Sequence, residues 1–95
     1  MEIESIRHKA LKTFAETGKS KGLPIKLVGR PRNMLAWLSV IESADELKMP
    51  PNFGAHKLTG DREGYWSLVV SKSWRMTFRI NQSLAIEDLD LEDYH

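Results

Sequence analysis

The sequence predicts an α+β fold in which two N-terminal helices pack on one face of a small antiparallel sheet. Two patterns along the chain predict this class. Apolar residues recur at three- and four-residue steps in the first half, as on one stripe of a helix, and at every second residue after position 54, as on one face of a strand. The chain has 95 residues, of which 41% are hydrophobic, so we expect one domain, 1–95, with one core.

Two helices are expected in the first half, after a weak strand over Glu2 to Ile6. The first carries an apolar stripe from Ala10 to Ala15 and ends at Gly18, a residue type that often terminates helices. The second has the strongest helical pattern, formed by Met34, Trp37, Leu38, Ile41 and Ala44. Pro31 either opens this helix in its first turn or kinks a longer helix that begins near Ile25.

The second half predicts a hairpin and a further strand. Residues 66–70 and 74–80 alternate in polarity around Lys72-Ser73, which we expect to form the turn. Leu84 to Leu91 forms the last expected strand, with a β-bulge at Glu87-Asp88 where the alternation slips. The helices must cover one face of the central strand, which consists of Trp74, Met76, Phe78 and Ile80.

The opposite face of this central strand carries Arg75 and Arg79. Acidic residues of the neighbouring strand are available as their partners, namely Asp88, Asp90 and Glu92. Cross-strand pairs of opposite charge are common in sheets, so a structural role for either arginine stays open at this point.

The net charge of +1 hides an uneven distribution. All fourteen Lys and Arg lie within residues 1–80, whereas residues 81–95 contain five acids and neither Lys nor Arg. Eight cations are concentrated in residues 7–32: Arg7, Lys9, Lys12, Lys19, Lys21, Lys26, Arg30 and Arg32. This cluster either follows a phosphate backbone or is a solvated helix face balanced by the acidic end.

Composition excludes several classes of protein. The length excludes a two-domain enzyme with a cofactor cleft, and the lack of Cys excludes a disulfide framework, a thiolate metal site and a cysteine nucleophile. No apolar run approaches the length of a membrane span, and the N-terminus lacks a signal-peptide pattern, so we expect a cytoplasmic protein with no membrane partner. His56, Asp93 and His95 lack the close spacing of a metal site, and we expect no metal.

Histidines and a terminal Asp-Tyr-His suggest acid/base chemistry. Metal-free RNA cleavage needs one group to take the 2′-OH proton, a second to protonate the 5′-oxygen and a cation to stabilise the phosphate. His56 and His95 supply imidazoles, and Arg75 or Lys57 supplies the cation. Each histidine also has a purely structural interpretation. His95 would be frayed and inert at the chain end, and His56 would be a half-buried histidine that shares a strand face with Leu58.

Three segments resemble the HigB branch of the RelE-type toxin superfamily. These are residues 56–67 (HKLTGDREGYWS), residues 73–78 (SWRMTF) and the terminal residues 92–95 (EDYH), and their order and spacing match across nearly the whole chain. The early His8-Lys9 and the basic first half match as well.

The resemblance implies a RelE-like fold and the toxin of a bacterial toxin/antitoxin pair. Such a toxin is a ribosome-dependent mRNA endonuclease that acts in the decoding site without a metal or other cofactor. Its implied partners are a cognate helix-turn-helix (HigA-like) antitoxin, the ribosome and mRNA, with operator DNA contacted only indirectly through the antitoxin.

The resemblance also implies the residues of the active site. His56, Arg75, Asp93, Tyr94 and His95 fall on family active-site positions. We expect His95, polarised by Asp93, to be the base and His56 the acid, with the reverse order left open, while Arg75 stabilises the phosphate and Tyr94 orients or stacks on a base.

The basic residues of the resemblance imply a docking surface for RNA. The expected ribosome- and RNA-binding residues are Lys9, Lys12, Lys19, Lys21, Lys26, Arg30, Arg32, Lys57 and Arg62. Thr59 departs from the family pattern, which often has Lys or Arg just before the Gly-Asp turn, and Lys57 or Arg62 is a candidate substitute.

Two other classes of function stay open from the residues. One is a non-catalytic module on the same fold that binds RNA, DNA or a protein partner. The other is a structural domain whose asymmetric charge drives self-association.

Overall fold

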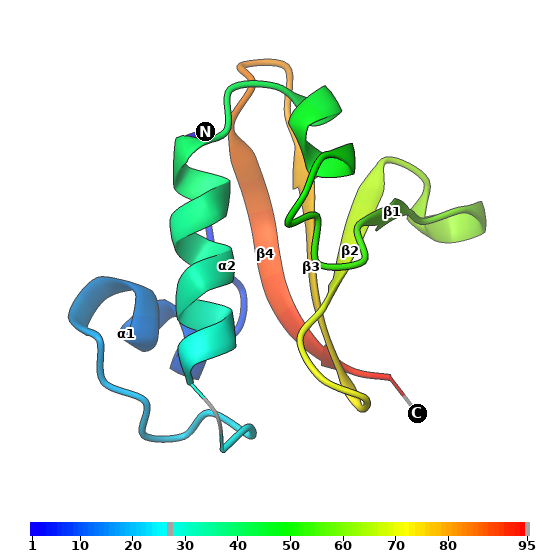
Figure 1. Cartoon of the computed structure of the whole chain (residues 1–95). Helices are drawn as coiled ribbons and strands as arrows, with labels where there is room; N and C mark the ends of the chain where they lie inside the picture. Colours follow the sequence, from blue (N-terminus) through cyan, green and yellow to red (C-terminus); the bar gives the residue numbers. More distant parts are fainter. Residues whose placement is uncertain (27, 95) are drawn as a thin grey trace.

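Two helices lie along one side of a four-stranded antiparallel sheet in the computed structural model, which describes residues 1–26 and 28–94 (Figure 1). The sheet has the order β1-β2-β3-β4. The elements are α1 (Lys9–Thr17), α2 (Gly29–Val40), η1 (Ala44–Lys48), β1 (His56–Lys57), η2 (Gly60–Arg62), β2 (Tyr65–Val69), β3 (Trp74–Ile80) and β4 (Ile86–Asp93). The predicted fold class is confirmed.

Helix α1 has the predicted end and an additional cap at its start. The His8 Nδ1 accepts a hydrogen bond from the backbone N–H of Leu11 at 3.2 Å. Gly18 ends the helix in the left-handed region (φ +79°), where its N–H donates to the Phe14 carbonyl at 2.8 Å. Leu11 and Phe14 are buried, so the predicted apolar stripe faces the core.

Helix α2 begins at Gly29, so Pro31 lies in its first turn and the first of the two alternatives is correct. The prediction that the helix extends to Ala44 is wrong, because the helix ends at Val40 and Ala44 begins the 3₁₀ turn η1. The Glu46 carboxylate accepts hydrogen bonds from the N–H groups of Glu42 and Ser43 at 2.6 and 3.1 Å. This local capping box starts a new element where periodicity predicted continuation.

Strands β2 and β3 form the predicted hairpin. Their register pairs Trp66 with Phe78 and Leu68 with Met76, and all four side chains are buried. The last paired residues are Val69 and Arg75, so the connection between the strands includes Val70 as well as the predicted turn residues. The alternate residues of each strand therefore lie on the face away from the helices.

The last strand is shifted relative to its prediction. β4 begins at Ile86, because Leu84 lies in the preceding turn with φ +59°, and it continues to Asp93. The predicted bulge is present: two β4 residues, Asp88 and Leu89, oppose one β3 residue, and Asp88 has φ +56°. The expected strand over Glu2 to Ile6 is reduced to two isolated parallel bridges to β4.

The core joins both helices, η1 and three of the strands. Its buried members include Phe14, Met34, Leu38, Leu47, Phe78 and Leu89. Within residues 1–26 and 28–94, no helix combines the length and the apolar character required to cross a membrane.

Leu38 and Val40 offer a matched test of this core. Leu38 is fully buried, whereas Val40, two residues further along α2, is 71% exposed. We expect Leu38→Ala to lower the free energy of unfolding by about 2–5 kcal/mol, because it leaves a cavity. Val40→Ala should change it by less than about 0.5 kcal/mol. Urea denaturation measures both, and equal effects would contradict the packing described.

Candidate active site

Residues from three strands share the face of the sheet opposite the helices. The register places His56 of β1 beside Ser67, and Ser67 beside Thr77 of β3. Arg75 lies on the same face, two residues from Thr77. With strand spacings of about 4.8 Å and a rise of about 3.4 Å per residue, the Cα atoms of His56 and Arg75 lie about 12 Å apart. Side chains of these lengths can reach one phosphodiester group from that separation.

His56 is exposed, so the alternative of a half-buried structural histidine is excluded. The regular strand contains only His56 and Lys57, and the preceding residues Asn52, Phe53 and Gly54 all have positive φ. His56 Nδ1 lies 3.3 Å from the Gly54 carbonyl oxygen. A carbonyl oxygen accepts hydrogen bonds, so in this contact Nδ1 carries the proton and Nε2 is the atom that can exchange one.

Arg75 and Tyr94 form the second part of the site. The Arg75 guanidinium carbon lies 4.0 Å from the centre of the Tyr94 ring, and Arg75 Nη1 donates to the Ser71 carbonyl at 2.7 Å. The Tyr94 N–H donates to the Ser73 carbonyl at 2.7 Å, which holds the end of β4 against the β2–β3 connection. Tyr94 is 63% exposed, so its ring is open to a ligand, whereas Arg75 is half-buried.

The remaining predicted catalytic residues are at the end of the chain. Asp93 is exposed and pairs with Trp74 in the β3–β4 register. His95 lies outside the described residues, so its approach to His56 stays a prediction.

Arg62 is held in an ion pair that crosses the face of the sheet. Its Nη1 and Nη2 atoms donate to the two Glu92 oxygens at 2.8 and 2.6 Å, and Glu92 Oε2 also accepts from the Thr77 hydroxyl. The hydrogen bond from Arg62 lowers the pKa of Glu92, against the opposing effect of burial. The same hydrogen bond raises the pKa of Arg62.

The acidic partners on this face differ from those predicted. Arg79 pairs with Glu87 at 2.9 Å, and the Tyr65 hydroxyl donates to Asp88 at 3.1 Å. Glu92 lies opposite Arg75 in the β3–β4 register, as expected, but its carboxylate is bound to Arg62.

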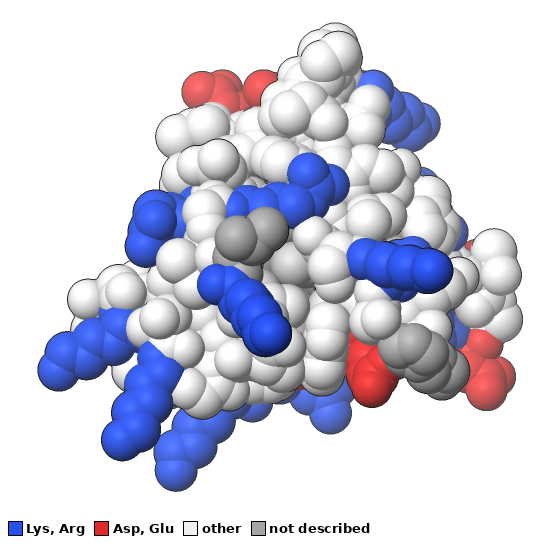
Figure 2. Space-filling view, turned by 60° about the horizontal axis from the view of Figure 1, so that its bottom comes forward, with Lys and Arg blue, Asp and Glu red and all other residues white. Residues whose placement is uncertain are grey.

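The eight cations of residues 7–32 are all exposed, and so is Lys57. Figure 2 shows one face of the molecule on which blue Lys and Arg side chains predominate, with red acidic side chains at its rim. Some cations also contact aromatic rings: the Arg32 guanidinium lies 5.5 Å from the centre of Phe14, and Lys57 Nζ lies 5.5 Å from the centre of Trp66.

Arg30 combines an exposed position with structural contacts. Its Nε and Nη2 atoms donate to the Val69 carbonyl at 3.0 and 2.8 Å, and its guanidinium lies 5.0 Å from the centre of the Phe53 ring. Arg30 therefore connects the start of α2 to the turn that precedes His56.

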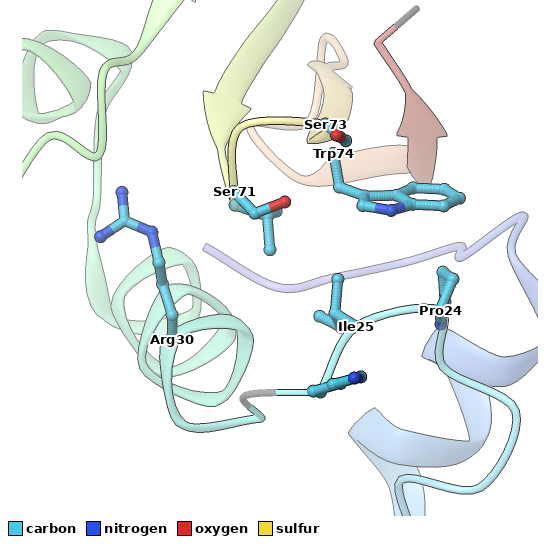
Figure 3. A pocket seen from close by; sticks show the side chains of 8 residues that line it. Pro24, Ile25, Arg30, Ser71, Ser73 and Trp74 are labelled. Carbon is cyan, nitrogen blue, oxygen red and sulfur yellow. The ribbon is translucent and has the colours of Figure 1, made fainter.

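A cavity of about 380 Å³ lies between residues 24–26, the start of α2 and the β2–β3 connection (Figure 3). Its walls include Ile25, Val70 and Trp74, with Lys26 and Arg30 among its polar members. None of the predicted catalytic residues among those described lines it. Residues 1–26 and 28–94 also contain no group of three His, Asp or Glu side chains suited to hold a metal ion.

Sequence reasoning missed Thr77, and a close backbone approach at Gly54 also shapes the site. Thr77 is buried, and its hydroxyl donates a hydrogen bond to Glu92. The alternation of the strand predicts only that a polar residue stands at this position. Gly54 has φ +65°, and a Cβ there would lie 2.8 Å from Val69 Cγ2. The Asn-Phe-Gly sequence at 52–54 was the available signal for this turn.

Gly54 and Gly60 provide a matched test of the turn before His56. Both have positive φ, but a Cβ at Gly60 meets no atom within 4 Å. We expect Gly60→Ala to destabilise by about 1 kcal/mol through backbone strain. Gly54→Ala should cost roughly 1–3 kcal/mol more, because the β-branched Val69 cannot yield easily. Urea denaturation of both variants measures the difference, and equal losses would contradict the close approach.

Glu92 predicts a pH dependence of stability. Its pKa in the folded chain lies below the ordinary value of 4.5, so its contribution is present above that value and is lost as the pH falls through the folded pKa. We expect the free energy of unfolding to fall more steeply below about pH 5 in the original chain than in Glu92→Gln. Urea denaturation at pH 7 and below pH 4 measures this, and parallel curves for the two proteins would contradict it.

Comparison with known proteins identifies the family of the chain. The family model of the RelE-like toxin of type II toxin-antitoxin system HigB matches residues 4–95. Endoribonuclease HigB of Proteus vulgaris is 40% identical over 94 residues, which cover 98% of this chain and 99% of the relative. The chain therefore belongs to the HigB-like family of RelE-like toxins of type II toxin-antitoxin systems.

Proposed function

We propose that the chain is an endoribonuclease that cuts mRNA in the decoding site of translating ribosomes by metal-independent acid/base chemistry. The observation that carries this proposal is the similarity over 98% of the chain to a protein named as an endoribonuclease. The shared face of His56, Arg75 and Tyr94 supports it, because an exposed imidazole and a guanidinium flank one open surface.

The proposed reaction is an internal transfer at phosphorus. The base takes the proton of the 2′-OH, the 2′-oxygen attacks the adjacent phosphorus, and the bond from phosphorus to the 5′-oxygen breaks as the acid protonates that oxygen. The products are a 2′,3′-cyclic phosphate and a 5′-OH. Arg75 stabilises the negative charge that develops on the phosphate oxygens.

The roles of the residues follow the expectation from the family resemblance. His56 acts as the acid through Nε2, since Nδ1 is directed to the Gly54 carbonyl. His95, polarised by Asp93, acts as the base, and the reverse order of the two histidines is the alternative. Tyr94 presents an exposed ring on which a base can stack beside Arg75.

The open surface explains why the ribosome is part of the proposal. His56 and Tyr94 are exposed and Arg75 is half-buried beside Tyr94, so the protein provides few walls to hold a flexible RNA in line for attack. The exposed cations of residues 7–32, with Lys57, supply the charge for docking on ribosomal RNA. Arg62 contributes to this charge, although its guanidinium is bound to Glu92.

Family membership supplies an antitoxin as a partner. We propose that it is a helix-turn-helix protein of the HigA type, and that the toxin meets operator DNA only through it. We further propose that residues 1–95 form one domain that acts in the cytoplasm, where the ribosomes translate.

Histidine variants test the proposed chemistry. We expect His56→Ala to reduce cleavage of mRNA on programmed ribosomes by about 10²–10⁴-fold, through loss of a proton donor. His8→Asn is the matched control, because Asn keeps the helix cap and the cleavage rate should not change. A folded His56→Ala protein that cuts at the original rate would contradict the role of His56.

The chemistry of the products distinguishes the mechanism. A 2′-deoxynucleotide at the cut site should block cleavage, because it removes the attacking oxygen. Products that end in a 3′-OH, or cleavage of the deoxy substrate, would contradict the acid/base mechanism. Salt-sensitive RNA binding without any cleavage would instead support a non-catalytic binding module.

A further inference from the structure

The segment that carries His56 is weakly anchored to the rest of the fold. Its regular pairing to β2 consists of two positions, and one more backbone hydrogen bond joins the Leu58 N–H to the Tyr65 carbonyl at 2.8 Å. Within residues 56–64, Leu58 and Arg62 are partly buried and the others are exposed. Burial of apolar side chains therefore contributes little to holding this segment in place.

Arg62 provides a different kind of anchor. Its side chain passes the Tyr65 ring of β2, with the guanidinium carbon 5.3 Å from the ring centre, and reaches Glu92 on β4. The contact is bidentate, with N···O distances of 2.8 and 2.6 Å, and the Thr77 hydroxyl of β3 fixes the same carboxylate. A planar guanidinium bound in this way specifies orientation as well as distance.

Glu92 lies on β4 close to both Arg75 and Tyr94. It is paired with Arg75 in the register and stands two residues before Tyr94, whose ring covers the Arg75 guanidinium. The Arg62–Glu92 contact therefore links the segment of His56 to the strand end that carries Tyr94. It also occupies a carboxylate that would otherwise lie beside Arg75 and compete with a substrate phosphate for that guanidinium.

We propose that the Arg62–Glu92 ion pair is a positioning device that holds residues 56–64 against the Arg75–Tyr94 part of the site and keeps Arg75 available to substrate. This inference rests on the proposed endoribonuclease function. It differs from the sequence-based expectation that Arg62 contacts RNA directly, and the two assignments predict opposite effects of changing Glu92.

The test compares Arg62→Gln, Glu92→Gln and the double variant in single-turnover cleavage on programmed ribosomes. We expect each single variant to lower the cleavage rate about 10- to 100-fold, with the KM for ribosomes changed less than about twofold. The double variant should be no slower than the slower single variant, because both changes remove one device. The Arg79→Gln and Glu87→Gln variants break the other ion pair of this face and should leave cleavage unchanged.

Three results would overturn the proposal. Full or increased activity of Glu92→Gln, together with reduced activity of Arg62→Gln, would assign Arg62 to direct RNA contact. Independent, multiplying losses in the double variant would show that the two residues do not act as a unit. If breaking the Arg79–Glu87 pair lowered the cleavage rate by the same factor, the loss in the Arg62 and Glu92 variants would reflect general destabilisation of the sheet.

Amide hydrogen exchange tests the anchor without any dependence on catalysis. Arg62→Gln and Glu92→Gln should both accelerate exchange of the Leu58 N–H more than that of the Val69 N–H, which donates to the Phe53 carbonyl in the turn before this segment. Unchanged exchange at Leu58 would contradict the anchor, whatever the RNA assay shows. Absence of cleavage by the original chain would contradict the proposed function and leave this measurement valid.

Discussion

The register of the antiparallel sheet is the constraint on which both the core and the candidate site depend. Successive side chains of β3 point to opposite faces, so Met76 and Phe78 enter the core while Arg75 and Thr77 face outward. The helices α1 and α2 cover one face (Figure 1), and the candidate site lies on the other. Each strand thus supplies core side chains from one face and outward-facing side chains from the other, and a register shift of one residue would exchange the two faces.

Charge has two distinct uses in this chain. The cations of residues 7–32 are exposed. Figure 2 shows a face on which Lys and Arg side chains extend into solvent and acidic groups are few. Arg30 and Arg62 are also partners in structural contacts, with the Val69 carbonyl and the Glu92 carboxylate respectively. A count of Lys and Arg therefore overstates the charge that is available to RNA, because part of it holds the segment around His56.

The sequence predicts most of what depends on local pattern. Alternation identifies the β2–β3 hairpin and the bulge near Asp88, and Gly18 marks the end of α1. Prediction from the sequence fails where two residues in contact are far apart along the chain, or where two local signals compete. The helical periodicity predicts that α2 continues to Ala44, whereas the Glu46 cap begins a new turn there. No local pattern identifies Arg62 as the partner of Glu92, because the two residues are 30 positions apart in the sequence. The alternative of a half-buried His56 fails because positive φ at Asn52 and Phe53 interrupts the regular strand on which that alternative depended.

The bulge at Asp88 determines which way the acidic end of the chain faces. Ile86 is buried before it, and Leu89 and Leu91 are buried after it, so the spacing of three residues changes the alternation once. If β4 instead ran through Asp88 without a bulge, strict alternation from Ile86 would turn Leu89 and Leu91 to solvent and Tyr94 toward the helices. The bulge therefore absorbs one extra residue while the apolar side chains on both sides of it stay on the core face, and a lineage that lost Asp88 would keep Leu89 and Leu91 in the core.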